Sequence, residues 1–164
     1  MKKALEFRNY LLESNPEFYN KIKYGINNDF IRDFGEEEIN IFGSLSNVVV
    51  NGDVNKAFEE GYNIGRCRFF AQTLSYGFEN CSIVNGILPI LKGTAGSPNG
   101  GHVWLEVNDQ IYDTTLLMVI NKQYSNVLAY FEKDRLDDMV IQNSDIYKCR
   151  KKRYFDLLLN KKLK

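Results

Sequence analysis

The sequence predicts an α+β fold in a single domain over residues 1–164. Apolar residues recur at helical spacing near both ends of the chain, whereas from His102 to Val107 they alternate in the two-residue period of a strand. We therefore expect N-terminal helices over about residues 1–35, a core that carries the candidate site over about 53–120, and a helical C-terminal part over about 126–164.

The composition is that of an ordinary globular protein. Of its 164 residues 44% are hydrophobic and 26% charged, and a chain of this length buries roughly two-thirds of the surface that it exposes when unfolded. Lys plus Arg and Asp plus Glu both number 21, so the net charge favours neither a nucleic acid nor a membrane surface as a partner. Basic residues gather near the C-terminus, where they are expected to form the solvated face of a last helix rather than a nucleic-acid site. They are Lys148, Arg150, Lys151, Lys152, Arg153, Lys161, Lys162 and Lys164.

No targeting or membrane-spanning segment is expected. Glu6 and Arg8 interrupt the N-terminal apolar stretch before it reaches the length of a signal peptide, and no apolar run approaches the roughly 20 residues of a membrane span. We therefore expect a cytoplasmic protein with no membrane partner. The cysteines Cys67, Cys81 and Cys149 are odd in number and widely spaced, which predicts reduced thiols. The paired spacing of zinc ligands is missing from the sequence, and we expect no metal ion and no cofactor.

The first third of the chain is predicted to be helical. Apolar residues between Ala4 and Leu12 recur at helical spacing, and Pro16 opens a second helix, a position where its missing N–H costs nothing. Residues 27–52 are expected to be irregular and could include a strand. The alternation of Ile39-Asn40-Ile41 and the β-branched run Val48-Val49-Val50 favour that strand.

Two helices are expected around the first cysteine. Asp53 is suited to cap a helix that runs through Tyr62, and Gly61 and Gly65 would shorten or end this helix. Cys67 then falls at the beginning of the next helix, which Gly77 terminates.

Strands are predicted over residues 81–91 and His102–Val107, joined by a loop of turn-forming residues over 93–101. Alternation in the second strand turns one apolar face toward the core. The opposite face, which carries Trp104 and Glu106, is expected to face a cleft.

The pair Asn108-Asp109 is a turn signal that predicts a β-hairpin. A hairpin centred on this pair places Asp113 opposite Trp104 and diagonal to His102 on the same face, within reach of a side-chain contact. Further along, the pattern predicts a continuation of the returning strand over Leu116–Ile120, a short helix over Val127–Leu136 and a final helix over Ile146–Leu159.

The chain contains one histidine, so any imidazole chemistry depends on His102. A cysteine at a helix start feels the positive end of the helix dipole, and a neighbouring imidazolium stabilises its thiolate further. We therefore predict Cys67 as a nucleophile, His102 as its acid and base, and Asp113 as the residue that orients the ring. The structural alternatives are a core cysteine, a buried strand histidine and an aspartate that caps a turn.

An oxyanion of the reaction would need hydrogen-bond donors. The backbone N–H of Cys67 at the helix start is the first candidate, and Asn63 and Tyr62 lie just upstream as further ones. Trp104 is expected to be a packing wall for the imidazole of His102.

Several blocks of the sequence also form a family pattern: a glycine and a cysteine that open a helix, an H-x-W-x-E strand, and a following strand with Asp and Thr. On these blocks, over roughly residues 60–116, the chain resembles the transglutaminase-like superfamily of papain-like cysteine enzymes. The resemblance implies a papain-like α+β fold whose nucleophile-bearing helix packs on an antiparallel sheet with His102 and Asp113. The blocks are Gly65-Arg66-Cys67 followed by Phe70-Ala71 and Leu74, Gly77-Phe78 through Ile83-Val84-Asn85-Gly86, His102-Val103-Trp104-Leu105-Glu106-Val107 and Tyr112-Asp113-Thr114-Thr115.

Two positions depart from the family pattern. The segment before Cys67 lacks a tryptophan or glutamine that would serve the oxyanion, and Thr114 stands where a proline usually follows the aspartate. The resemblance implies a cysteine hydrolase, a peptidase or amidase that forms a thioester acyl-enzyme with a peptide or protein substrate. Two alternatives stay open: an acyl transferase of transglutaminase or arylamine acetyltransferase type, and a non-catalytic binding module on the same fold.

Overall fold

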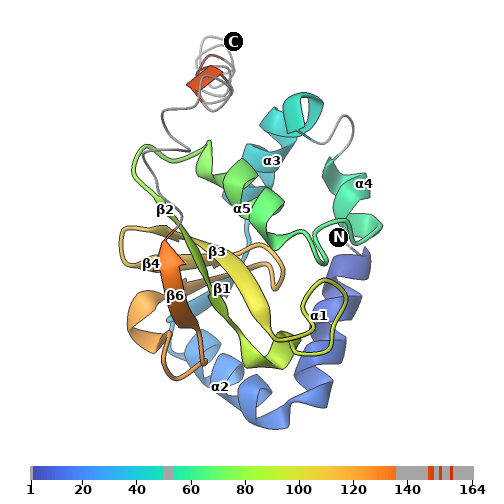
Figure 1. Cartoon of the computed structure of the whole chain (residues 1–164), viewed down its shortest axis with the longest axis vertical. Helices are drawn as coiled ribbons and strands as arrows, with labels where there is room; N and C mark the ends of the chain where they lie inside the picture. Colours follow the sequence, from blue (N-terminus) through green and yellow to red (C-terminus); the bar gives the residue numbers. More distant parts are fainter. Residues whose placement is uncertain (1, 50–53, 136–147, 150–151, 153–155, 157–164) are drawn as a thin grey trace.

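The computed structural model describes residues 2–49, 54–135, 148–149, 152 and 156. It shows an α+β fold in which a six-stranded antiparallel sheet is packed against helices on both faces (Figure 1). The strands are β1 (Ile31–Asp33), β2 (Ser82–Ile87), β3 (Gly101–Val107), β4 (Gln110–Asp113), β5 (Met118–Asn121) and β6 (Phe131–Arg135), in the order β1-β5-β4-β3-β2-β6. The helices are α1 (Lys2–Ser14), α2 (Pro16–Asn27), α3 (Glu36–Val49), α4 (Val54–Glu59) and α5 (Cys67–Ser75), with 3-10 turns η1 (Pro89–Leu91) and η2 (Lys122–Tyr124).

The two N-terminal helices form as predicted. Pro16 occupies the first turn of α2, where a missing backbone N–H leaves no hydrogen bond unmade. Each helix buries one apolar side, and Leu11 of α1 and Ile22 of α2 belong to one cluster with Trp104 of the sheet. Both helices therefore cover the same face of the sheet.

The prediction of an irregular segment over residues 27–52 was wrong for most of its length. Glu36 begins α3, whose first turn is acidic and so matches the positive end of the helix dipole. Glu38 in that turn also accepts hydrogen bonds from the N–H of Gly35 and the guanidinium of Arg32. These contacts outweigh the strand preference of the β-branched residues near the end of the helix.

Strand β1 precedes this helix and pairs with β5, so that Ile31 lies opposite Ile120. This strand could not be predicted from the sequence, because its three residues are too few to show an alternating pattern and its partner strand lies some ninety residues further along the chain. The predicted cap Asp53 and the end of the predicted strand at Val50 lie outside the described residues.

The segment before the first cysteine folds as expected. Helix α4 ends at Glu59, and Gly61 and Gly65 follow with φ of +74° and +73°, a backbone conformation that favours glycine. Tyr62 therefore lies beyond the helix that was predicted to include it. Cys67 is the first residue of α5, as predicted.

The hairpin that follows has the predicted register. Val107 of β3 pairs with Gln110 of β4, which leaves Asn108-Asp109 as a two-residue turn. Strand β2 ends at Ile87, before the predicted end, because Pro89 starts a 3-10 turn. The chain also turns after Asp113, so that β5 begins at Met118 and pairs with β4 instead of prolonging it.

The short helix predicted over Val127–Leu136 was wrong, because Phe131–Arg135 forms the edge strand β6. This strand pairs with β2, and the register of the pairing shifts between Asn85 and Gly86. No local sequence pattern predicts this pairing. Most of the predicted final helix lies outside the described residues, although its described members Lys148, Cys149, Lys152 and Asp156 are helical and exposed.

Two hydrophobic clusters lie on opposite faces of the sheet. Val103 and Leu105 of β3 join the cluster that contains the packed rings of Phe42, Phe58 and Phe70. Trp104 points the other way, into the cluster formed with α1 and α2. Each such buried aromatic or aliphatic side chain stabilises the fold by roughly 1.5–3 kcal/mol relative to exposure.

The cleft predicted on the Trp104 face does not extend over His102 and Trp104. These two residues are 2% and 1% exposed, and Trp104 packs in the cluster formed with α1 and α2. Glu106, further along the strand, lines a space of about 560 Å³ together with Lys122 and Arg135. Access to His102 has to come from the end of β3 and not from the face of the sheet. None of the helices over the described ranges is long and apolar enough to cross a membrane.

We expect Gly86→Ala to destabilise the protein. A Cβ on Gly86 would clash with the backbone carbonyl of Phe131 and lie 2.5 Å from Cη2 of Trp104, where neither neighbour can move freely. Overpacking of this kind lowers the free energy of unfolding by about 1–3 kcal/mol, which urea titration measures. Gly101→Ala is the matched control, because its Cβ would meet no atom within 4 Å. Equal stability of the two variants would contradict this packing.

Candidate active site

Cys67 lies at the exposed start of α5, and its side chain is partly buried. The preceding residue, Arg66, makes no side-chain hydrogen bond that caps the helix. Burial raises the pKa of the Cys67 thiol, but the hydrogen bond and charge of His102 and the backbone N–H of Val103 outweigh burial. The net effect is a pKa below the ordinary thiol value, which favours the thiolate.

His102 links this thiol to a carboxylate. Its Nε2 lies 2.9 Å from Oδ2 of Asp113, and the two side chains are almost completely buried. Burial lowers the pKa of the ring, but Asp113 and the Cys67 thiolate raise it to about 10. Because Nε2 is occupied by Asp113, Nδ1 is left to face the sulfur of Cys67.

Asp113 is held by four donors. Its Oδ1 accepts the backbone N–H groups of Thr115 and Leu116, each at 2.9 Å, and its Oδ2 accepts the Tyr130 hydroxyl at 2.7 Å in addition to His102. Burial raises the pKa of Asp113, but His102 and these donors lower it below the ordinary value. A buried carboxylate that is paired in this way stays charged and keeps the ring in one orientation.

The predicted oxyanion candidate Asn63 has another task. Its side-chain amide is fully buried and donates to the carbonyls of Thr114 and Thr115, at 3.1 and 3.4 Å. Both amide hydrogens are therefore engaged. The contact ties the segment before Cys67 to the turn after Asp113, so Asn63 supports the site without facing a substrate.

Tyr62 and Trp104 are placed differently from one another. Tyr62 is exposed, and the guanidinium of Arg66 lies 5.4 Å from the centre of the Tyr62 ring. None of the described contacts of Tyr62 joins its hydroxyl to Cys67. The ring of Trp104 lies 6.1 Å from that of His102 and packs edge-on against Tyr130. Trp104 thus lies where a packing wall for the imidazole was predicted.

A narrow slot opens beside the thiol. Its lining contains both Cys67 and His102. The other lining residues are Phe7, Gly65, Leu91, Thr94, Ala95, Gly96, Ser97, Gly101 and Thr115. The slot, as we call this space, has a volume of about 20 Å³. A cavity of this size holds about one water molecule.

Sequence reasoning missed three contributors to this arrangement. Tyr130 falls in a segment that was expected to be helical, and its contact with Asp113 depends on the unpredicted pairing of β6. Thr115 was part of the quoted Tyr112-Asp113-Thr114-Thr115 block, but nothing in that block indicated that its backbone N–H would hold Asp113. Gly96 belongs to a loop whose path across the site depends on tertiary contacts.

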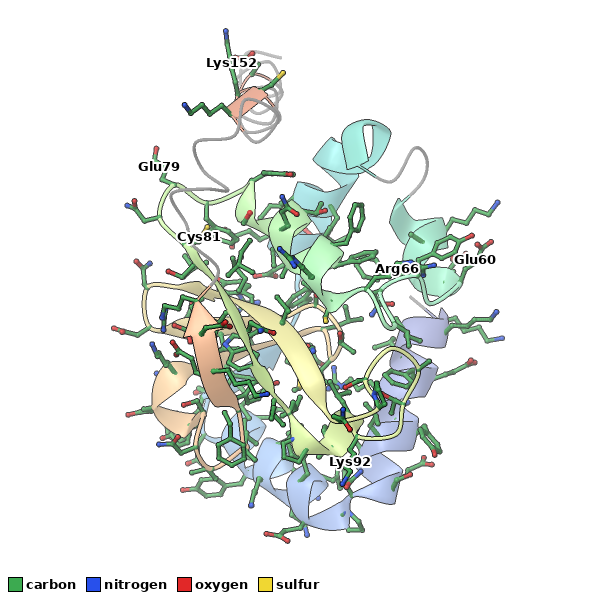
Figure 2. All side chains as sticks on the ribbon, viewed as in Figure 1. Glu60, Arg66, Glu79, Cys81, Lys92 and Lys152 are labelled. Atoms are coloured by element: carbon green, nitrogen blue, oxygen red, sulfur yellow. The ribbon has the colours of Figure 1, made fainter. Side chains whose placement is uncertain are left out.

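The other two cysteines are remote from this centre. Figure 2 places Cys81 near Glu79 and away from Arg66, the residue before Cys67. Cys149 is exposed, and all three thiols are free of disulfide bonds. In the described part of the chain, no group of three or more His, Cys, Asp or Glu side chains is arranged to hold a metal ion.

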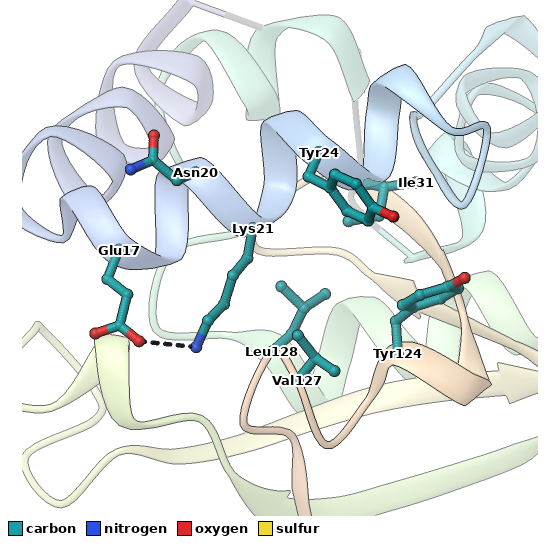
Figure 3. A pocket seen from close by; sticks show the side chains of 8 residues that line it. All are labelled: Glu17, Asn20, Lys21, Tyr24, Ile31, Tyr124, Val127 and Leu128. Carbon is teal, nitrogen blue, oxygen red and sulfur yellow. Dashed lines mark ion pairs between the residues drawn. The ribbon is translucent and has the colours of Figure 1, made fainter.

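A roomier pocket of about 300 Å³ lies between α2 and the turn after η2 (Figure 3). Tyr24 and Tyr124 flank it, Leu128 contributes to its floor, and an ion pair of 3.1 Å joins Lys21 to Glu17 at its edge. No thiol or imidazole lines this pocket. The thiol of Cys67 and the imidazole of His102 therefore line the slot and not this larger pocket.

No protein-family model matches this chain, and neither a curated protein nor a solved structure matches it. The chemistry of the site therefore has to follow from its own contacts. Those contacts place a thiol, an imidazole and a carboxylate in one hydrogen-bonded series.

We expect Tyr130→Phe to destabilise the protein in a pH-dependent way. The folded pKa of Asp113 lies below its unfolded value, so its stabilisation is present above about pH 4 and is lost as the pH falls through the folded pKa. Loss of the Tyr130 hydrogen bond should lower the free energy of unfolding by about 1–3 kcal/mol near pH 7, and this deficit should shrink in acid. Urea titrations across this pH range measure it.

Tyr124→Phe is the control for this prediction, because Tyr124 stacks on Phe30 outside the Asp113 network. Its effect on stability should be small and independent of pH. A deficit of Tyr130→Phe that stays constant through the acid range would show that the hydroxyl does not act on the Asp113 carboxylate.

Proposed function

We propose that this chain is a cysteine hydrolase, a peptidase or amidase of papain-like or transglutaminase-like fold, acting on a peptide or protein substrate. The observation that carries the proposal is the series of contacts from Cys67 through His102 to Asp113. Burying three ionisable groups in one hydrogen-bonded series costs desolvation free energy. Such a series has a direct use in catalysis, as nucleophile, proton carrier and orienting group.

The proposed reaction starts from a Cys67 thiolate and a protonated His102. The Cys67 thiolate attacks the substrate carbonyl carbon, and as the tetrahedral intermediate collapses the C–N bond breaks and the amine leaves with a proton from the His102 imidazolium. A thioester on Sγ remains. Water then attacks the thioester and gives a proton to His102, the C–S bond breaks, and the carboxylic acid leaves with the thiolate and the imidazolium restored.

The start of α5 supports the stabilisation of the oxyanion in both steps. The N–H of Cys67 lies in the first turn of the helix, where backbone donors have no partner within the helix and the dipole is positive. An oxyanion formed on the carbon bonded to Sγ lies next to this N–H.

The papain-like part of the proposal is supported by the order of elements. The nucleophile opens a helix that packs on an antiparallel sheet, the histidine lies at the start of β3, and the aspartate ends β4. Hydrolysis needs only a water molecule beside the thioester, and the slot of about 20 Å³ has the size of one water molecule. A binding module would have no use for a thiol whose pKa is lowered in this way.

We expect Cys67 to react with iodoacetamide well below the pH at which ordinary thiols do. At about pH 6 its labelling, resolved by mass spectrometry, should exceed that of Cys149 by about tenfold or more, because the pKa of Cys67 is held below the ordinary thiol value by His102. His102→Ala should remove this advantage, and Asp113→Asn should weaken it.

Cys149 serves as the internal standard in each sample, since it is exposed and belongs to the same chain. If Cys67 is labelled no faster than Cys149, or equally fast in His102→Ala, the activated nucleophile and the proposed function are refuted.

A second experiment separates hydrolysis from acyl transfer and from binding alone. With p-nitrophenyl acetate, we expect a burst of one nitrophenolate per chain and an acetyl group on Cys67, because the thiolate can attack any accessible activated ester. Turnover that is unchanged by added amines supports hydrolysis. Acceleration with formation of an acetylated amine would establish transfer, and absence of the burst in a protein that still labels with iodoacetamide would favour a binding module.

A further inference from the structure

The slot beside Cys67 is too small to hold a residue of a substrate. Its volume of about 20 Å³ corresponds to about one water molecule. The backbones of Gly65 and Gly96 both line it, and they lie so close together that a Cβ on Gly96 would be 2.7 Å from Cα of Gly65. An acyl group bonded to the sulfur therefore lies outside the slot, and a single water molecule fits inside it.

Three residues with hydroxyl groups line the slot, and two of these hydroxyls hold the loop before β3. The Ser97 hydroxyl donates to the Gly101 carbonyl at 2.8 Å, and the Thr94 hydroxyl donates to the Leu91 carbonyl at 2.6 Å. Ser97 and Thr94 also pair with one another in an isolated antiparallel bridge. Figure 1 shows this loop, in yellow-green after η1, next to the start of α5. Both hydroxyls are therefore engaged in fixing the lining of the slot.

The third hydroxyl, that of Thr115, has no partner among the described residues. Thr115 is 4% exposed, and its Oγ1 is buried without a hydrogen bond to any of them. Its backbone N–H donates to Oδ1 of Asp113 at 2.9 Å, which fixes the residue next to the carboxylate that orients His102. A hydroxyl that is buried without a partner is unfavourable. A water molecule in the slot would supply the missing partner.

The second step of the proposed reaction needs a water molecule at this place. The water has to lie beside the thioester on Cys67 and to give a proton to His102, and both residues line the slot. Because Nε2 of His102 lies 2.9 Å from Asp113, the nitrogen that receives this proton is Nδ1. Once the amine has left with the proton of the imidazolium, Nδ1 carries a lone pair and accepts a hydrogen bond from water.

We propose that the slot holds the water molecule that hydrolyses the thioester, and that the Thr115 hydroxyl positions this water. The inference rests on the proposed function, since it assigns a residue to the second step of that reaction. One hydrogen of the water faces Nδ1 of His102 and the other faces the Thr115 oxygen, which leaves a lone pair for the acyl carbon. As the water oxygen bonds to this carbon, its proton passes to Nδ1. The C–S bond then breaks, its electron pair returns to Sγ of Cys67, and the carboxylic acid leaves.

Thr115→Val tests this role, because it removes the hydroxyl and keeps the shape of the side chain. With p-nitrophenyl acetate, the burst of nitrophenolate measures acylation of Cys67, and the slower steady release measures hydrolysis of the thioester. In Thr115→Val the burst should keep its amplitude and, to within about twofold, its rate, whereas the steady rate should fall about tenfold through loss of one hydrogen bond to the water. Mass spectrometry should then find the acetyl group on Cys67 for a correspondingly longer time.

Two further variants separate the hydroxyl from a general effect on the site. Thr115→Ser keeps the hydroxyl and should restore the steady rate. Thr114→Val is the matched control, since Thr114 is also buried and its hydroxyl also lacks a described partner, but Thr114 does not line the slot. Its burst and its steady rate should both match those of the unmodified protein. In every variant the burst amplitude counts the folded, reactive sites, so a loss of folded protein is not mistaken for slow hydrolysis.

The outcomes separate this inference from the proposed function. An unchanged steady rate in Thr115→Val, an equal loss in Thr114→Val, or a slowing of burst and steady rate together would overturn the role of the Thr115 hydroxyl and leave the nucleophile in place. An unmodified protein that labels slowly with iodoacetamide at Cys67, or that shows a burst without any later turnover, would instead refute the hydrolase, and the inference with it.

Discussion

The buried carboxylate of Asp113 is the interaction on which the rest of the structure depends. Its four donors come from the start of β3, from the turn after β4 and from Tyr130, just before the edge strand β6. A buried charge left without such partners would cost several kcal/mol, so these elements have to assemble together. The carboxylate that closes the turn is also the one that orients His102, which joins the stability of the sheet to its chemistry.

Coverage of both sheet faces explains where the chemistry can take place. Helices α1 and α2 bury the face that bears His102 and Trp104, and α3, α4 and α5 cover the other. The reactive groups therefore meet at the end of β3, where α5 begins and the loop around Gly96 closes over the sulfur. This burial lowers the pKa of His102, but the charge and hydrogen bond of Asp113 raise it further than burial lowers it. The approach to Cys67 is narrow.

Local signals in the sequence were enough to predict the centre of the site but not its surroundings. The turn at Asn108-Asp109 sets the register that brings Asp113 to His102, and Cys67 follows a glycine at a helix start. The contact of Tyr130 with Asp113 depends on the pairing of β6 with β2, two segments far apart in the sequence. The residue pattern of neither strand indicates which strand it will pair with. The same holds for β1, and for the part of the predicted cleft, at Trp104, that α1 and α2 turned out to cover.

The proposed function requires Cys67 and His102 to form a thiolate–imidazolium pair at neutral pH. Because the chain has one histidine, the ¹⁵N and ¹H resonances of its imidazole report on His102 without assignment by mutation. The most direct measurement is their titration by NMR. The account predicts a ring protonated on both nitrogens through neutral pH that titrates near pH 10, with a lower pKa in Cys67→Ala, where the thiolate is missing. A neutral ring at pH 7 that titrates near the ordinary value of 6.5 would contradict it.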